Sequence, residues 1–97
     1  DDPDKRERIE ALVLVLRSVL DARKRVMIEF NLDADRLDSV LPMVPSMRQP
    51  TIATLRGQLG VAVKAAVPKS GLAALIPTLK SAGATDVVVS RIDQIVA

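Results

Sequence analysis

The chain repeats its own pattern of apolar residues and prolines at an offset of 35 residues. Four positions recur in order: Leu37, Val40, Leu41 and Pro42 return as Leu72, Leu75, Ile76 and Pro77. The strand-like segment 27–32 likewise returns as 62–67, and residues 51–53 return as 86–88. Two strand–helix–strand copies cannot each bury an apolar face alone, so we expect them to share one sheet. The sequence therefore predicts an α+β fold, a ferredoxin-like βαββαβ sandwich.

The composition fits one folded domain of 97 residues. Hydrophobic residues make up 48% of the chain, which is enough for a core and for an interface besides. The net charge is only +2, and the 14 basic and 12 acidic side chains are interspersed, so charge gives no evidence of nucleic-acid binding. No apolar run reaches the roughly 18–20 residues that a membrane-spanning helix needs. We therefore expect no nucleic-acid and no membrane partner.

Cysteine and histidine are both absent from the chain. Their absence removes disulfides, thiolate nucleophiles, imidazole bases and the usual zinc ligands together. Only carboxylates and lysines remain as possible bases, and the sequence does not pair them. We therefore expect no metal, no cofactor and no catalysis in this chain, and the lack of cysteine is compatible with a cytoplasmic location.

A helix is predicted to precede the repeat. Its apolar residues follow helical spacing: Ile9, Leu12, Val13, Leu16, Val19 and Leu20. Asp2 and Asp4 suit the start of such a helix, and Val15 widens its apolar stripe. We expect the helix, from about Lys5, to contact both its own domain and a neighbour. Residues 1–23 are interpreted as a connecting helix with an acidic lead-in, and residues 24–97 as the ferredoxin-like domain.

Strands are predicted over residues 26–32, 51–55, 61–67 and 86–92. Alternation assigns one residue in two to the core: Val26, Ile28, Phe30, Leu32, Ile52, Thr54, Val61, Val63, Ala65, Val67, Val87 and Val89. Asp33 or Asp35 is expected to cap the first crossover helix and Ser70 the second, which ends at Gly83. Both helices then cover the same face of the sheet.

The opposite face of the sheet, which we call the open face, is predicted to stay uncovered. Its residues are Met27, Glu29, Ala53, Leu55, Ala62, Lys64, Val88 and Ser90. This set is too apolar to face water comfortably, so we expect it to pack against another subunit in a homo-oligomer. RNA-recognition modules share this topology but stack bases on aromatic residues of the open face. The single aromatic residue here, Phe30, belongs to the core set, which argues against that function.

Five segments, in this order and spacing, resemble a known family: 17–23, 35–42, 50–52, 61–68 and 75–85. Together they resemble the C-terminal regulatory domain of long-form ATP phosphoribosyltransferase, the first enzyme of histidine biosynthesis, over residues 8–96. The resemblance implies an allosteric domain that binds L-histidine as feedback inhibitor between neighbouring subunits of a hexamer. The parent's catalytic domains, which use Mg²⁺, would lie N-terminal to it. The chain begins without Met at an acidic stretch, as expected of an excised domain that is itself non-catalytic.

The resemblance also implies the positions of an effector site. They are Asn31, Met47, Thr51, Ala66, Thr85 and Asp86. Asp86 can accept a hydrogen bond from an ammonium group, and Asn31 can both donate and accept. The offset of 35 maps Asn31 onto Ala66 and Thr51 onto Asp86, so the implied pocket consists of pseudo-equivalent strand ends.

Each implied site residue also has an ordinary structural explanation. Asn31 suits the end of a strand, Thr51 its start, and Asp86 a solvated turn. The alternative function is therefore a structural oligomerisation domain without effector binding.

Two positions depart from the family pattern, since Gln49 stands where serine is common and Gly60 where an aromatic residue often precedes the third strand. The basic run 23–25 is interpreted as the solvated junction between a helix end and a strand.

Overall fold

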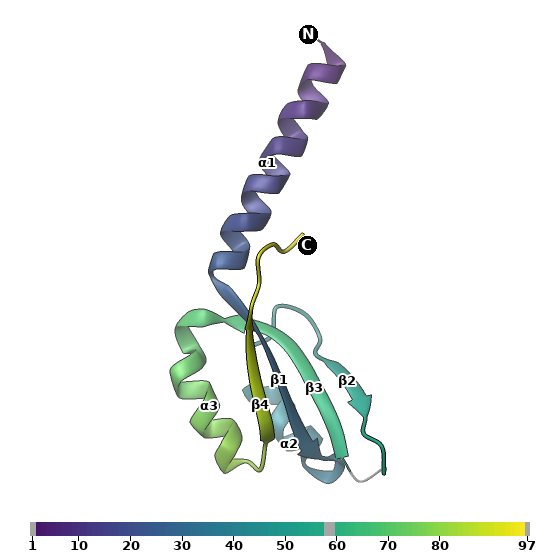
Figure 1. The fold of residues 1–97 in the computed structure, drawn as a ribbon, viewed down its shortest axis with the longest axis vertical. Coiled ribbons are helices and arrows are strands. Elements are labelled where there is room, and N and C mark those ends of the chain that lie inside the picture. The colour runs from purple at the N-terminus through teal and green to yellow at the C-terminus, as the bar shows by residue number, and fades with distance from the viewer. Residues whose placement is uncertain (1, 58–59, 97) are drawn as a thin grey trace.

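The computed structural model describes residues 2–57 and 60–96 (Figure 1). The elements follow in the order α1 (Pro3–Arg23), β1 (Arg25–Asp33), α2 (Leu37–Val40), β2 (Thr51–Thr54), β3 (Gly60–Pro68), α3 (Leu72–Ser81) and β4 (Thr85–Arg91). Short 3₁₀ turns η1 (Ala34–Arg36), η2 (Leu41–Met43) and η3 (Lys69–Gly71) flank the crossover helices. This order confirms the predicted α+β ferredoxin-like fold with a preceding helix.

The four strands form one antiparallel sheet in the order β2-β3-β1-β4. The central strands β1 and β3 pair over their whole length, from Arg25 opposite Pro68 to Asp33 opposite Gly60. The unit β1–α2–β2 corresponds to β3–α3–β4, so the two central strands are pseudo-equivalent and so are the two outer ones. The offset of 35 in the sequence thus corresponds to an approximate two-fold relation within the sheet.

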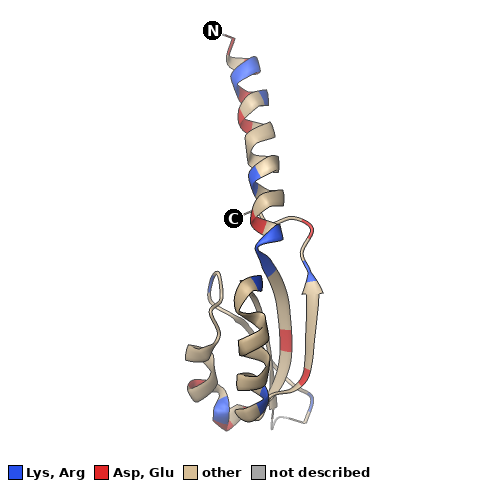
Figure 2. Cartoon of the chain, turned by 90° about the vertical axis from the view of Figure 1, so that its left-hand side faces the viewer, with Lys and Arg blue, Asp and Glu red and all other residues tan. Residues whose placement is uncertain are grey.

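The core lies between one face of the sheet and the helices α2 and α3, which cover the same side (Figure 2). Every inward residue predicted for the central strands is buried: Val26, Ile28, Phe30, Leu32, Val61, Val63, Ala65 and Val67. The helices add Val40, Leu75 and Leu79 to this layer. Phe30 and Leu79 are 1% and 0% exposed, so they lie at the centre of the core.

The outer strands are less covered than the alternation predicts. Ile52 and Thr54 pair with core residues of β3 and so lie on the core side, yet both are exposed. At the other edge Val87 packs against the core, whereas Val89 is 40% exposed. The helix α2 has only four residues and gives way to a 3₁₀ turn at Pro42, so the first crossover covers little of the sheet.

The helix ends follow the prediction in part. Gly83 has a φ of +101° and directly follows the C-cap of α3, as expected for a residue that can adopt the left-handed conformation. The predicted side-chain caps are wrong: Asp33 precedes η1 without a capping hydrogen bond, and Asp35 lies inside that turn. Ser70 lies inside η3, and the N-cap of α3 is Gly71. A tight 3₁₀ turn precedes each crossover helix and pairs backbone groups that a side-chain cap would otherwise satisfy.

The strand β3 begins at Gly60, where the packing leaves no room for a side chain. A Cβ atom there would lie 3.0 Å from Leu55 Cδ1 and 3.3 Å from the Leu32 carbonyl oxygen. Leu55 therefore occupies the space beside Gly60, and its amide donates to the Gly60 carbonyl at 2.9 Å just beyond the end of β2.

The helix α1 projects away from the sheet (Figure 1). It begins at Pro3, two residues earlier than predicted, and Asp2 caps it by accepting a hydrogen bond from the Asp4 amide at 3.0 Å. Its apolar stripe is exposed, with Leu12 at 59%, and the buried residues of the helix are Ser18 and Ala22. The helix thus contacts its own domain near its C-terminal end, whereas most of its apolar stripe contacts nothing else in the described part of the chain.

Candidate functional site

The six implied effector residues fall into two groups at opposite ends of the sheet. One lies where β1 ends and β4 begins, and the other lies where β3 ends and β2 begins. We call them the β4 group (Asn31, Thr85 and Asp86) and the β2 group (Met47, Thr51 and Ala66). The two groups are pseudo-equivalent, because the internal two-fold relation exchanges β1 with β3 and β4 with β2.

The strand register gives the separation of the two groups. Asn31 pairs with Ala62, whereas Ala66 pairs with Met27, so the two positions are four residues apart along β3, or about 13 Å. The outer strands β2 and β4 are three strand spacings apart, about 14 Å across the sheet. One amino acid therefore cannot contact both groups of the same chain.

The β4 group is built around a β-bulge. Pairing between β1 and β4 shifts between Glu29 and Asn31, which leaves one extra residue in β4 and places Asn31 opposite Thr85. Asp86 has a φ of +52°, a left-handed conformation that aspartate adopts more readily than most non-glycine residues. In this geometry Asp86 Oδ2 accepts a hydrogen bond from Asn31 Nδ2 at 3.1 Å. Within residues 2–57 and 60–96 the other carboxylate oxygen has no donor, so it is available to a cationic ligand.

The β2 group lines a small hollow at the other end of the sheet. The Met47 amide donates to the Ala66 carbonyl at 2.9 Å and so fixes the loop before β2 to the end of β3. Thr51 begins β2 opposite Lys64. The hollow measures about 170 Å³ and is also lined by Met27, Arg48, Gln49, Lys64 and Ala65. This volume is below the range of about 300–1,000 Å³ that is typical of small-molecule sites.

Two cationic residues of this hollow are absent from the predicted site. Arg48 follows Met47 in the loop, and Lys64 lies beside Thr51 across the β2–β3 pair. Lys64 Nζ also lies 3.7 Å from Glu29 Oε1 in an exposed ion pair on the open face. Arginine and lysine can both hold a carboxylate, so the hollow lined by the β2 group suits the anionic part of a ligand, whereas the β4 group suits a cationic part. The alternation of β3 places Lys64 on the open face, but only the register of β2 brings it to Thr51.

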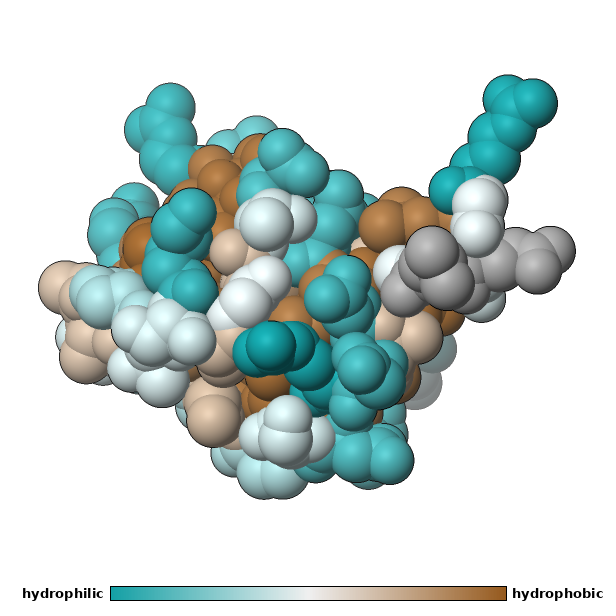
Figure 3. Space-filling view, turned by 90° about the horizontal axis from the view of Figure 1, so that it is seen from below, coloured by the Kyte–Doolittle hydropathy of each residue, from teal (hydrophilic) through white to brown (hydrophobic). Residues whose placement is uncertain are grey.

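The open face is free of covering elements in the described part of the chain. The helices lie on the opposite side of the sheet, and Glu29, Ala53, Val88 and Ser90 are exposed on the open side. Seen from the end remote from α1, apolar surface alternates with hydrophilic side chains (Figure 3). The exposed residues of the open face thus include the apolar Ala53 and Val88 beside the polar Glu29 and Ser90.

Residues 2–57 and 60–96 hold no group of three or more side chains that could bind a metal ion. In the same ranges no helix combines the length and the apolar character that crossing a membrane requires.

The family of this chain follows from its sequence together with this fold. Residues 22–94 match the family described as HisG, C-terminal domain. The chain belongs to this family. The match covers β1 to β4 and therefore includes both the β4 group and the β2 group.

Several curated relatives of this HisG C-terminal domain are named ATP phosphoribosyltransferase. The protein of Pelotomaculum thermopropionicum is 42% identical over 88 residues, which is 91% of this chain and 30% of the relative. The protein of Chlorobium phaeovibrioides is 38% identical over 84 residues, covering 87% of this chain and 29% of the relative. The protein of Natronomonas pharaonis is 38% identical over 96 residues, covering 99% of this chain and 33% of the relative. The chain thus spans about a third of the length of these relatives, and the family indicated by its motifs is confirmed.

Proposed function

We propose that this HisG C-terminal domain is the allosteric domain of an ATP phosphoribosyltransferase and binds L-histidine as a feedback inhibitor. Relatives of that name match nearly the whole chain. The parent's transfer reaction then belongs to its other domains, since this chain spans only about a third of the relatives' length. Its role is then to bind the effector and to help assemble the oligomer.

The division of the effector residues into two groups carries the proposal. Each group alone is incomplete: the β4 group offers a free carboxylate oxygen of Asp86, and the β2 group offers a small hollow with Arg48 and Lys64. A free amino acid carries an ammonium and a carboxylate, which these two groups complement. We infer that the β4 group of one copy and the β2 group of a neighbouring copy bind one histidine between them.

A site shared by two copies also provides a mechanism of inhibition. A ligand shifts an equilibrium between two arrangements only by its difference in affinity for them. Histidine binds the arrangement of the oligomer in which the β4 group of one copy meets the β2 group of a neighbouring copy. The other arrangement of the oligomer lacks this site. Occupancy therefore favours one arrangement of the oligomer, and the reciprocal effect on substrate binding follows from linkage.

Titration of the 97-residue chain with L-histidine tests the effector proposal. Two or three hydrogen bonds to charged groups, less the ordering costs, support a Kd on the order of micromolar. Isothermal titration calorimetry suits this chain because it has no Trp or Tyr for fluorescence. Light scattering on the same sample gives the oligomeric state. We expect saturable heat from an oligomeric sample, and none with L-leucine.

The same titration separates the two candidate functions. An oligomeric sample that gives no heat with L-histidine would contradict effector binding and favour a structural oligomerisation domain. A monomeric sample would lack the shared site, so the titration would then be run on the full-length parent enzyme. Absence of saturable heat there would reject the effector site as well.

A charge placed on the open face tests the proposed interface. Ala62 lies on that face, between Asn31 of β1 and Ala53 of β2. Ala62→Glu would bury an unpaired carboxylate in the interface, at a cost on the order of 3 kcal/mol or more in association free energy. We expect sedimentation velocity to show a shift to smaller species. The matched control is Ala73→Glu on the exposed side of α3, and equal profiles for both variants would contradict this interface.

A further inference from the structure

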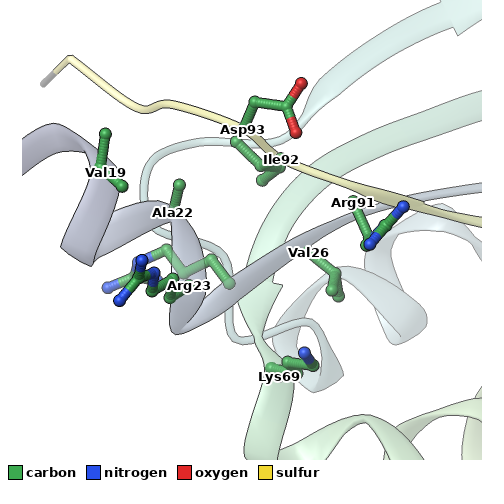
Figure 4. A pocket seen from close by; sticks show the side chains of 9 residues that line it. Val19, Ala22, Arg23, Val26, Lys69, Arg91, Ile92 and Asp93 are labelled. Atoms are coloured by element: carbon green, nitrogen blue, oxygen red, sulfur yellow. The ribbon is translucent and has the colours of Figure 1, made fainter.

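We propose that a basic cleft at the base of α1 binds a small phosphate-bearing anion, independently of the histidine site. The cleft has a volume of about 500 Å³, and its cationic lining consists of Arg23, Arg25, Lys69 and Arg91 (Figure 4). The end of α1, the start of β1, the turn η3 and the end of β4 each supply one of these residues. The cleft and the hollow beside Thr51 have no lining residue in common, so they are separate sites.

Basic residues are concentrated at this cleft although the chain is nearly neutral. The four lining cations and the adjacent Lys24 make up five of the 14 basic residues, whereas Asp93 is the one acidic residue of the lining. The rest of the chain carries nine basic and eleven acidic residues. The blue segments at the foot of α1, the start of β1 and the end of β4 lie together (Figure 2). A concave surface lined by one sign of charge concentrates counter-ions of the other sign.

The protein itself does not neutralise these cations. Among the described residues, Arg23, Arg25, Lys69 and Arg91 make no ion pair and no side-chain hydrogen bond. The carboxylate of Asp93 points away from Lys69 and Arg23 (Figure 4). An anion that binds among these cations in the folded state stabilises that state.

Hydrogen bonds outside the cationic side chains hold the walls of the cleft in place. The Lys69 amide donates to the Lys24 carbonyl at 2.8 Å, which joins η3 to the start of β1. On the other side, the Ile95 amide donates to the Ser18 carbonyl at 3.2 Å, and Gln94 Nε2 donates to Ser18 Oγ at 2.8 Å. Ser18 is buried, so this contact fixes the C-terminal segment against α1. These contacts fix the backbone around the cleft, and the cationic side chains extend from this fixed frame.

The chemistry of the lining selects the class of ligand. Arginine presents a planar fork of N–H donors that matches phosphate oxygens, and lysine adds a compact charge. Val19, Val26 and Ile92 form apolar surface in the same cleft, and its volume falls in the range typical of small-molecule sites. A phosphate ester meets both features, because it combines several negative charges with an organic part.

Titration of the 97-residue chain with inorganic pyrophosphate at low salt tests this proposal. We expect saturable binding by calorimetry and a rise in the melting temperature followed by circular dichroism. Lys69→Gln and Arg91→Gln should each weaken binding about tenfold, since each removes a charged partner of the anion. The matched control is Lys80→Gln, which removes one positive charge from the exposed side of α3 and should leave the Kd unchanged.

Three results would overturn the proposal. One is the absence of saturable binding to the unmodified chain at low salt. The second is an equal loss of affinity in Lys80→Gln and Lys69→Gln, which would assign the binding to overall charge. The third is unchanged affinity in Lys69→Gln while its circular dichroism spectrum matches that of the parent chain. Lys69 is exposed and its side chain has no partner among the described residues, so this variant keeps the test valid if Arg91→Gln fails to fold.

Discussion

Replacing Phe30 by alanine is expected to lower the free energy of unfolding by about 3–5 kcal/mol. Phe30 is 1% exposed, is the one aromatic residue of the chain, and lies in the central strand β1 opposite Val63. Its removal leaves a cavity that the sheet and the two short crossover helices can fill only in part. For a domain of this size the change corresponds to a fall of about 15–30 °C in melting temperature.

Circular dichroism during heating and during urea titration measures this effect. The total stability of a small domain is about 5–15 kcal/mol, so Phe30→Ala removes a large share of it. Val96→Ala is the matched control, because Val96 is exposed in the C-terminal segment, and we expect a change of less than about 0.5 kcal/mol. Equal melting temperatures for the two variants would contradict the position of Phe30 at the centre of the core.

The central part of the fold could be predicted because it depends on local alternation. In β1 and β3 every second residue is apolar, and these strands lie in the middle of the sheet, where any helix layer buries them. Burial of the outer strands depends on how far the helices extend. The helix α2 has only four residues because the chain continues as a 3₁₀ turn at Pro42. The spacing of apolar residues does not show where this change occurs. Ile52 therefore lies on the predicted side of the sheet but is exposed, because the short helix α2 does not cover it.

The grouping of the site residues could also have been read from the repeat. The pseudo-two-fold axis exchanges Asn31 with Ala66, and these residues lie toward opposite ends of the antiparallel pair β1–β3. The two groups of site residues therefore cannot lie next to each other within one chain. The basic cleft is different, because the run 23–25 gives no sign that Lys69 and Arg91 join it. That juxtaposition arises from the crossover connections, which bring the ends of β3 and β4 to the start of β1.

Co-expression of two defective chains is expected to restore histidine sites that neither chain forms alone. Asp86→Asn removes the charge of the β4 group but keeps a side chain that tolerates the φ of +52° and can accept the Asn31 hydrogen bond. We expect it to weaken histidine binding about 10- to 100-fold. Ala66→Leu leaves the β4 group intact and fills the hollow of about 170 Å³ in the β2 group. Each variant alone therefore lacks one half of every site.

Random assembly of the two chains produces one intact pairing in four. A complete site needs the β4 group from an Ala66→Leu chain and the β2 group from an Asp86→Asn chain, so about a quarter of the sites regain normal affinity. Calorimetry measures this as a high-affinity stoichiometry of about a quarter per chain. A site built within one chain could not be restored in this way, because every chain carries one defect. Absence of high-affinity sites in mixed oligomers that remain folded would therefore reject the shared site, whereas their recovery requires that neighbouring copies each contribute one group.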